Sequence, residues 1–579
     1  MKSFLCLMLV AAPLAAQPSP AESWVPSLAP LIGRPASELR DVVARYSSDR
    51  RALGRRYDLQ ASAMRRTAIA NFDRAWLAQV AGIGFDRLSL DGRIDHVLLR
   101  NLLNRELAEL RRDSVRAVEM APALPFAEIL AGLHEGRRSF VAPDAAGTAR
   151  TLAGLTRTVD SVRTRLEDST NTRPPKIVAL RATETLVELA GATKRWYEFH
   201  AGYDPVFTWW AKQPYEQLAA ALERYRKFLR EKILGAKDGD DEPIVGDPIG
   251  RQALIEDLGF EMIPYGPEEL VTIAEREFAW CDAKMLKASR ALGFGEDWRA
   301  ALEKVKTLHG GPGEQPGIVR DLAREAIAFV EQRDLVTVPA LAKDVWRMEM
   351  MSPERQKVSP FFLGGEVILV SFPTDAMAEA DKQMSMRGNN TYFSRATVHH
   401  ELIPGHHLQG FMAERYQPHR ADFRTPFYSE GWSLYWEMLL WDLGFPATPE
   451  QKVGMLFWRM HRAARIIFSL KFHLGEMSPA QAVDFLVNRV GHERANATAE
   501  VRRSFNGTYS PLYQIAYMMG GLQFRALRQE LVDGGKMSIK AFHDAVLQSG
   551  NLPVELVRAG LMKQPPRSDF RSSWRFAGL

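Results

Sequence analysis

The sequence predicts a mainly α-helical protein with a small β-sheet. Apolar residues recur at the spacing typical of amphipathic helices in four stretches: 175–195, 215–235, 268–292 and 318–330. The best strand candidate is 367–372, an apolar run between a glycine pair and Pro373. This strand is either buried within the sheet or forms an edge that binds an extended peptide backbone.

This pattern divides the chain into two regions. We expect a helical N-terminal region over 17–339 that covers one side of a cleft. The region over 340–579 is expected to contain the sheet and the residues that carry chemistry. Because no long flexible linker separates the two regions, they also fit two lobes of one unit.

The first residues are typical of a secretory signal peptide over 1–16. Lys2 precedes an apolar run that ends in Pro-Leu-Ala-Ala, which predicts cleavage near Ala16-Gln17. Cleavage would remove Cys6 and leave Cys281 as the only cysteine, which excludes an intrachain disulfide in the mature protein. We therefore expect an exported protein, periplasmic or secreted. No later apolar stretch reaches the ~18 residues of a membrane span, so no stable membrane insertion is predicted.

The composition is that of an ordinary globular protein. Of the 579 residues, 46% are hydrophobic and 25% are charged, and the formal net charge is only +5. No recognised nucleic-acid motif and no stripe of basic and aromatic residues occurs, so nucleic acid is not expected as a partner. The oligomeric state is left open by the sequence.

The histidine cluster at 399–407 is the main sign of chemistry. It reads His-His-Glu-Leu-Ile-Pro-Gly-His-His. Zinc sites of hydrolases use H-E-x-x-H, in which two histidines are ligands and the glutamate is a base. Here Pro404-Gly405 interrupts that motif as a two-residue insertion. We predict His400 and His406 as ligands of one Zn²⁺ per chain, with Glu401 as the general base.

A regular helix could not bring these two histidines to one metal ion. At about 100° per residue, His400 and His406 point about 120° apart, and His407, on the same face as His400, lies about 10 Å further along. The helix must therefore break, and Pro404-Gly405 supplies the break, because proline removes a backbone donor and glycine frees the backbone. His407 is the alternative to His406 as the second ligand.

The third ligand is expected in Glu-Gly-Trp-Ser-Leu-Tyr-Trp-Glu at 430–437. Glu430 lies 24 residues beyond His406 and follows Ser429, which suggests a position near a helix start. Glu437 falls about two turns later on the same face, where it could orient a ligand histidine. We predict Glu430 as the third metal ligand.

These two motifs resemble those of a known bacterial family, catalogued as domain of unknown function 885 and grouped with the gluzincin metallopeptidases. Its motifs run H-E-x-x-P-G-H-H-L-Q and E-G-W-A-L-Y; residues 400–409 here match the first, and 430–435 match the second except for Ser433 in place of alanine. Two later stretches, 462–482 and 500–520, resemble further family patterns. The sequence departs from those patterns at Ser469, Phe472 and Leu512-Tyr513.

The resemblance implies a two-lobed, helical, zincin-like fold and a zinc peptidase that hydrolyses short peptides. Gluzincins stabilise the tetrahedral intermediate with a tyrosine, histidine or arginine. Tyr517 is the first candidate because it lies within the last family pattern, followed by His473 and Arg503. The same site would also suit hydrolysis of a non-peptide amide or ester, and a third possibility is a binding protein that retained the fold.

Overall fold

The computed structural model describes residues 24–26, 28, 31–33, 36–236, 243–311, 313–356, 359–507 and 509–578. The predicted signal peptide, its cleavage site and Cys6 lie outside this part of the chain. The structure is mainly helical with one two-stranded parallel sheet, as the sequence predicts. Cys281 is a buried free thiol. Within the described residues, no helix combines the length and the apolar character that a membrane span requires.

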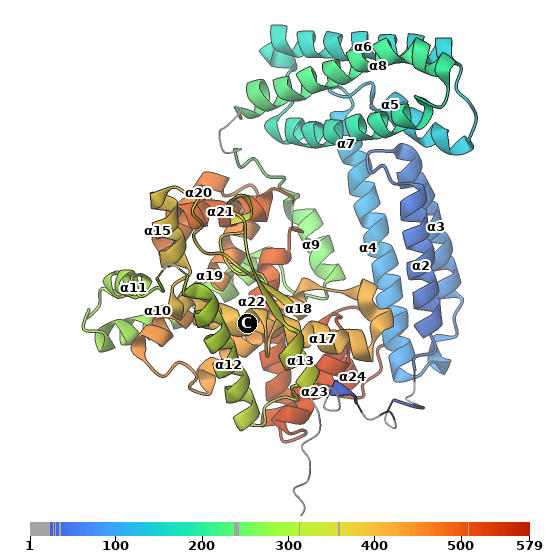
Figure 1. The fold of residues 1–579 in the computed structure, drawn as a ribbon. Helices are drawn as coiled ribbons and strands as arrows, with labels where there is room; N and C mark the ends of the chain where they lie inside the picture. Colours follow the sequence, from blue (N-terminus) through green and yellow to red (C-terminus); the bar gives the residue numbers. More distant parts are fainter. Residues whose placement is uncertain are drawn as a thin grey trace, which may run out of the picture.

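Three helices of the N-terminal part run side by side and lead to a separate group of helices (Figure 1). The three are α2 (Arg40–Arg56), α3 (Ala63–Ala81) and α4 (Leu90–Met120). The group beyond them, which we call the distal lobe, consists of α5 (Ala127–Gly136), α6 (Ala145–Asp168), α7 (Lys176–His200) and α8 (Pro205–Phe228).

The remaining helices and the sheet form a larger body, which we call the central lobe (Figure 1). Its first elements are α9 (Gly250–Phe260), α10 (Pro267–Ala291), α11 (Trp298–Lys306), α12 (Gln315–Gln332), α13 (Ala340–Val345), β1 (Arg347–Met350), α14 (Pro353–Gln356), β2 (Val367–Val370) and α15 (Glu379–Gly388). They are followed by α16 (Thr391–Glu401), α17 (His406–Tyr416), α18 (Pro426–Asp442), α19 (Pro449–His473), α20 (Pro479–Phe485), α21 (Arg494–Phe505), α22 (Tyr513–Arg528), α23 (Ile539–Gln548) and α24 (Val554–Leu561). Short 3-10 helices lie at Phe85–Arg87, Arg137–Ser139, Thr170–Thr172 and Pro418–Phe423, and π-helical turns at Leu229–Leu234, Leu486–Val490 and Gln529–Asp533.

The two lobes have separate hydrophobic cores. One core lies between residues 59 and 234 and fills the distal lobe. The largest core runs from Leu39 to Val557 and combines α2, α4 and α10 with the C-terminal helices. Because this core contains residues from both sides of position 339, hydrophobic packing does not mark a boundary there.

The small sheet lies directly before the histidine motif. Strands β1 and β2 pair in parallel, with Arg347 opposite Val367. On the other side of β2, Leu363 and Leu369 exchange backbone hydrogen bonds of 3.0 and 2.7 Å. Strand β2 is therefore flanked on both sides at Leu369, and Ile368 and Val370 are fully buried. Of the two alternatives for this segment, the buried strand is the one that the structure contains.

Candidate metal centre

The predicted break in the histidine motif is confirmed. Helix α16 ends at Glu401 and α17 begins at His406, so residues 402–405 form the turn between them. Gly405 lies so close to the preceding helix that a Cβ atom there would be 1.9 Å from the carbonyl oxygen of His400. The break brings the rings of His400 and His406 to 4.8 Å between centroids, nearly perpendicular to each other.

Glu430 completes a three-residue arrangement with these histidines. Its Oε2 lies 3.4 Å from Nε2 of His400 and 3.1 Å from Nε2 of His406. Ligands of a tetrahedral zinc ion with bonds of about 2.1 Å stand about 3.4 Å apart. The oxygen therefore stands at zinc-ligand spacing from each of the two nitrogens, and all three atoms are of a type that binds zinc.

Helix α18, which carries Glu430, begins earlier than the sequence suggested. Thr425 is its N-cap and accepts a hydrogen bond from the amide of Phe427, and Pro426 occupies the first helical position. Ser429 is therefore not a cap, and Glu430 sits beyond the first turn. The carboxylate is directed by packing of α18 rather than by a helix terminus.

The second carboxylate of the site, Glu401, differs from Glu430 in its electrostatics. Burial raises the pKa of Glu401, although His400 and His406 act against this shift. Burial would also raise the pKa of Glu430, but contact with His406 and His400 holds it well below its usual range. Glu401 is also further from the histidines, with Oε2 4.0 Å from Nε2 of His406. These directions fit the predicted roles of Glu430 as a ligand and Glu401 as a base.

Glu437 occupies the position expected of a residue that orients His400. Its Oε1 accepts a hydrogen bond of 2.7 Å from Nδ1 of His400 and one of 3.3 Å from Arg462. Burial opposes ionisation of Glu437, but Arg462 and His400 outweigh it and lower the pKa to about 2. A charged Glu437 holds a proton of His400 on Nδ1, which turns Nε2 toward Glu430.

A tyrosine and a group of arginines complete the wall of the site. The ring of Tyr517 stacks on His400 at 5.9 Å, and the guanidinium carbons of Arg462 and Arg465 lie 4.6 and 4.4 Å from its centroid. Burial raises the pKa of Tyr517, so its hydroxyl keeps a proton to donate. The hydroxyl of Tyr513 donates to Oε1 of Glu430.

Sequence reasoning assigned no role to three of these neighbours: Arg462, Arg465 and Tyr513. The two arginines stood within a family pattern, three residues apart, a spacing that places both on one face of a helix. That spacing was the available signal. Tyr513 was noticed only as a departure from the family pattern, and nothing in the sequence linked it to Glu430.

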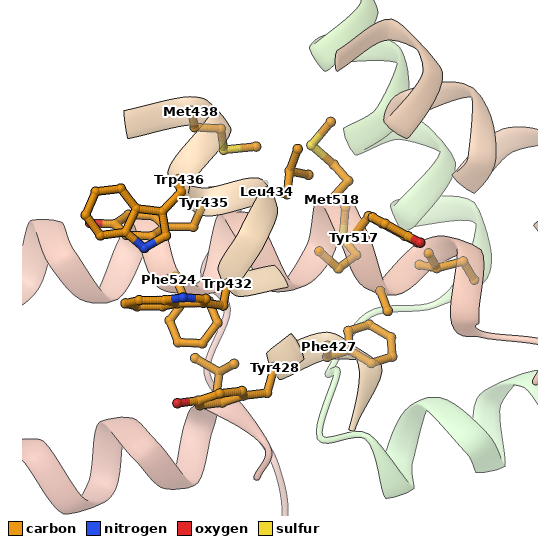
Figure 2. Packing of buried hydrophobic residues seen from close by; sticks show 14 of the residues in the cluster. Phe427, Tyr428, Trp432, Leu434, Tyr435, Trp436, Met438, Tyr517, Met518 and Phe524 are labelled. Carbon is orange, nitrogen blue, oxygen red and sulfur yellow. The ribbon is translucent and has the colours of Figure 1, made fainter. Parts of the chain in front are cut away.

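Two glycines allow the helices of the site to pack closely against each other. A Cβ atom on Gly520 of α22 would lie 1.9 Å from the carbonyl oxygen of Phe427 in α18. A Cβ atom on Gly431 would in turn lie 2.5 Å from Cα of Gly520. Figure 2 shows the aromatic side chains of α18 beside α22, and Trp432 packs edge-on against Phe524 at 5.7 Å. This backbone contact brings Glu430 and Tyr517 to the same cavity.

A cavity of about 340 Å³, which we call the metal-site cavity, lies at the centre of this arrangement. It contains His400, Glu401, His406, Glu430 and Tyr517 together, and Arg503 from α21 also lines it. Its other wall is the turn at 361–365 before β2. A Cβ atom on Gly364 would lie 2.4 Å from Oε2 of Glu401, so this turn closes over the proposed base.

Two predicted residues lie away from this cavity. His407 donates from Nε2 to the carbonyl oxygen of Ala342 at 2.7 Å, so it does not face His400 and is not a second ligand. His473 lines a different cavity of about 590 Å³, between the distal lobe and the ends of α19 and α21. The structure therefore does not bring His473 to Tyr517 and the predicted metal ligands.

Comparisons with known proteins agree with this architecture. Residues 49–561 match a family described as a bacterial protein of unknown function (DUF885). A solved structure described as a "putative lipoprotein of unknown function" from Shewanella oneidensis aligns with a TM-score of 0.66 and 17% identity, over 91% of this chain and 100% of that one. A "putative lipoprotein" from Colwellia psychrerythraea aligns with a TM-score of 0.57 and 16% identity, over 91% and 97%. None of the curated proteins matches the chain. At these identities the likeness shows the fold alone.

Proposed function

Because the chain belongs to the bacterial family of unknown function DUF885, whose description names no reaction, we propose from the site itself that this protein is a zinc-dependent peptidase of the gluzincin type. One observation carries the proposal. Nε2 of His400 and of His406 converge on Oε2 of Glu430 at zinc-ligand spacing, with the carboxylate of Glu401 beside them. The zincin-like architecture is part of this proposal.

Each residue of the site has a separate role in the proposed hydrolysis. A zinc ion, when bound, polarises a carbonyl group and makes water nucleophilic near neutral pH. Glu401, with its raised pKa, takes the proton of the attacking water and later gives it to the leaving amine. Tyr517 donates a hydrogen bond to the oxygen that gains charge. Glu437 keeps the ring of His400 in one orientation.

The proposed substrates are short peptides outside the cytoplasm. The metal-site cavity, at about 340 Å³, lies at the lower end of ligand pockets, which favours short segments over folded proteins. Export is supported by the signal-peptide pattern at 1–16 and by the description of both structural neighbours as lipoproteins.

The first test is metal content, measured by mass spectrometry on the purified mature protein. We expect about one zinc per chain in the wild type and in Glu401→Gln, and almost none in Glu430→Ala. The loss follows because the glutamate contributes one of three protein ligands. Zinc retained in Glu430→Ala would assign the third ligand to Glu401 or elsewhere, and no zinc in the wild type would overturn the proposal.

The second test is hydrolysis. We expect the zinc-loaded wild type to cut short peptides from a mixed library, detected by mass spectrometry, and Glu401→Gln to be slower by about 10² to 10⁴. An ester and a non-peptide amide, measured beside the peptides, show which bond is preferred. Cleavage of the ester alone would replace the peptidase with a hydrolase of another bond.

A further inference from the structure

Three arginines line the metal-site cavity, and two of them share one carboxylate. Arg462 and Arg465 come from α19 and Arg503 from α21, and each is at most 4% exposed. Arg462 is matched by Glu437, which accepts its hydrogen bond at 3.3 Å. The other two arginines share a single carboxylate, Glu500.

The contacts of Glu500 show this imbalance. The side chain is fully buried, and Arg465 donates from Nε to its Oε1 at 2.7 Å. Arg503 approaches it only as an ion pair, with Nη1 3.9 Å from Oε2. The remaining acid near Arg465 is Glu430, which is already bound to two histidines. Two buried guanidinium groups therefore share the one carboxylate of Glu500.

The same two arginines have unused hydrogen-bond donors. Nη1 of Arg465 and Nε of Arg503 are buried and have no hydrogen-bond partner among the described residues. An unpaired buried charge is costly, and a guanidinium group is shaped to bind both oxygens of a carboxylate. The missing partner thus has the chemistry of a carboxylate that enters the metal-site cavity.

We infer that Arg465 and Arg503 bind a carboxylate of the substrate, and that this is the C-terminal carboxylate of a short peptide. The inference rests on the proposed peptidase function and specifies it as a carboxypeptidase. Water adds to the carbonyl carbon, the C–N bond breaks, and the proton taken by Glu401 goes to the amine of the released C-terminal fragment.

The geometry sets the size of that fragment. The ring of Tyr517 lies 5.9 Å from the His400 ring and 4.4 Å from the guanidinium carbon of Arg465, and the sum of these distances is the most that can separate the histidine from the arginine. Because an extended residue spans about 3.5 Å, one or two residues fit between the bond that is cut and the carboxylate. The enzyme should therefore release single amino acids or dipeptides.

Peptide binding to the metal-free protein tests whether the arginines recognise a carboxylate, independently of catalysis. We expect calorimetry to show that the dipeptide Ala-Phe binds at least tenfold more tightly than its C-terminal amide. Arg503→Gln should abolish that difference. Equal affinity of wild-type protein for the acid and the amide would overturn the inference whether or not the protein proves to be a peptidase.

Hydrolysis of three matched tetrapeptides then identifies the source of the carboxylate. They are a free acid, its C-terminal amide, and an amide whose last residue is glutamate. We expect only the free acid to be cut efficiently, with one or two residues released and kcat/KM at least tenfold above either amide. Efficient cleavage of the glutamate amide would overturn the C-terminal assignment in favour of a side-chain carboxylate. Equal cleavage of all three would overturn the inference and leave the peptidase standing, whereas cleavage of none would count against the proposed function.

Variants at Arg503 separate recognition from folding. Arg503→Gln leaves Glu500 paired with Arg465, so the protein should fold and bind zinc as the wild type does. We expect KM for the free acid to rise at least tenfold while that for the amide is unchanged, with partial recovery in Arg503→Lys. Arg502→Gln, on the same helix but not lining the cavity, is the matched control and should behave as wild type. An unchanged KM in Arg503→Gln would contradict the assignment.

Discussion

The distal and central lobes are both helical, but they differ in the number of charged side chains that they bury. Within helices α5–α8 the only buried polar side chains are His134, Glu135 and Thr193. Helices α16–α21 instead bury a series of charged groups: Arg395, Glu401, Glu430, Glu437, Arg459, Arg462, Arg465, Glu500 and Arg503. Buried charges cost free energy even when paired. The central lobe therefore gives up stability to bury charged groups, whereas the interior of the distal lobe is mainly apolar.

The largest predicted loss of stability comes from a substitution that creates a cavity in the core of the distal lobe. Leu218 of α8 is fully buried, so Leu218→Ala should lower the free energy of unfolding by about 2–5 kcal/mol. Because Leu218 belongs to the core that lacks the proposed metal ligands, zinc per chain should not change. Urea unfolding and metal analysis measure the two quantities.

Val187→Ala in α7 is the control for that experiment. Val187 is 56% exposed, so its truncation should change the free energy of unfolding by no more than about 0.5 kcal/mol. If Leu218→Ala also released zinc, the two lobes would be coupled and the comparison would fail.

Two glycine-to-alanine variants, one in each lobe, test whether the helix backbones of the central lobe pack more closely than those of the distal lobe. Gly520→Ala puts a methyl group against the carbonyl oxygen of Phe427, so α18 and α22 must separate, at a cost of about 1–3 kcal/mol. Zinc affinity should fall as well, because Glu430 lies on α18. Thermal unfolding and a zinc titration measure the two effects.

Gly154→Ala in α6 is the counterpart in the distal lobe. The nearest atom to the new methyl group is 3.8 Å away, at the end of the Arg157 side chain. Alanine favours a helix interior, so the free energy of unfolding should rise by about 0.5–1 kcal/mol. If Gly154→Ala were destabilised as much as Gly520→Ala, the cost at Gly520 could not be attributed to the close backbone contact between α18 and α22.

The parts of the site that the sequence predicted are those fixed by local geometry. The break at Pro404-Gly405 followed from helix periodicity, because His400 and His406 could not share a metal ion on a regular helix. Glu430 and Glu437 were placed on one face by their seven-residue separation. In the structure they lie on opposite sides of the His400 ring, at Nε2 and Nδ1.

The parts that the sequence did not predict depend on the length of elements and on contacts between distant segments. His473 and Arg462 lie on the same face of α19, but they are 11 residues apart on an unbroken helix, which separates them by about 16 Å along its axis. That separation keeps His473 out of the metal-site cavity. The bond from Tyr513 to Glu430 joins segments 83 residues apart, and no local pattern specifies such a pair.

The last test concerns the pH dependence of stability and a buried histidine of the central lobe. In the central lobe His543 is fully buried, with Nδ1 donating to the carbonyl oxygen of Leu335 and Nε2 accepting from Tyr435, each at 2.7 Å. Burial lowers its pKa from 6.5 to about 3. The folded protein therefore keeps His543 neutral, whereas the unfolded chain takes up a proton below about pH 6.5.

The free energy of unfolding should consequently fall as the pH drops from 6.5 toward 3, by about 1.4 kcal/mol per pH unit for this residue. His543→Asn removes the titration but retains an N–H donor, so its slope between about pH 5 and 6.5 should be shallower than that of the wild type. Tyr435→Phe removes the other hydrogen bond without removing the titration, and its slope should match the wild type. Both variants are measured by urea unfolding in EDTA, which keeps metal release out of the comparison. Because every other titrating group is common to the three proteins, equal slopes in all three would mean that His543 is protonated in the folded central lobe.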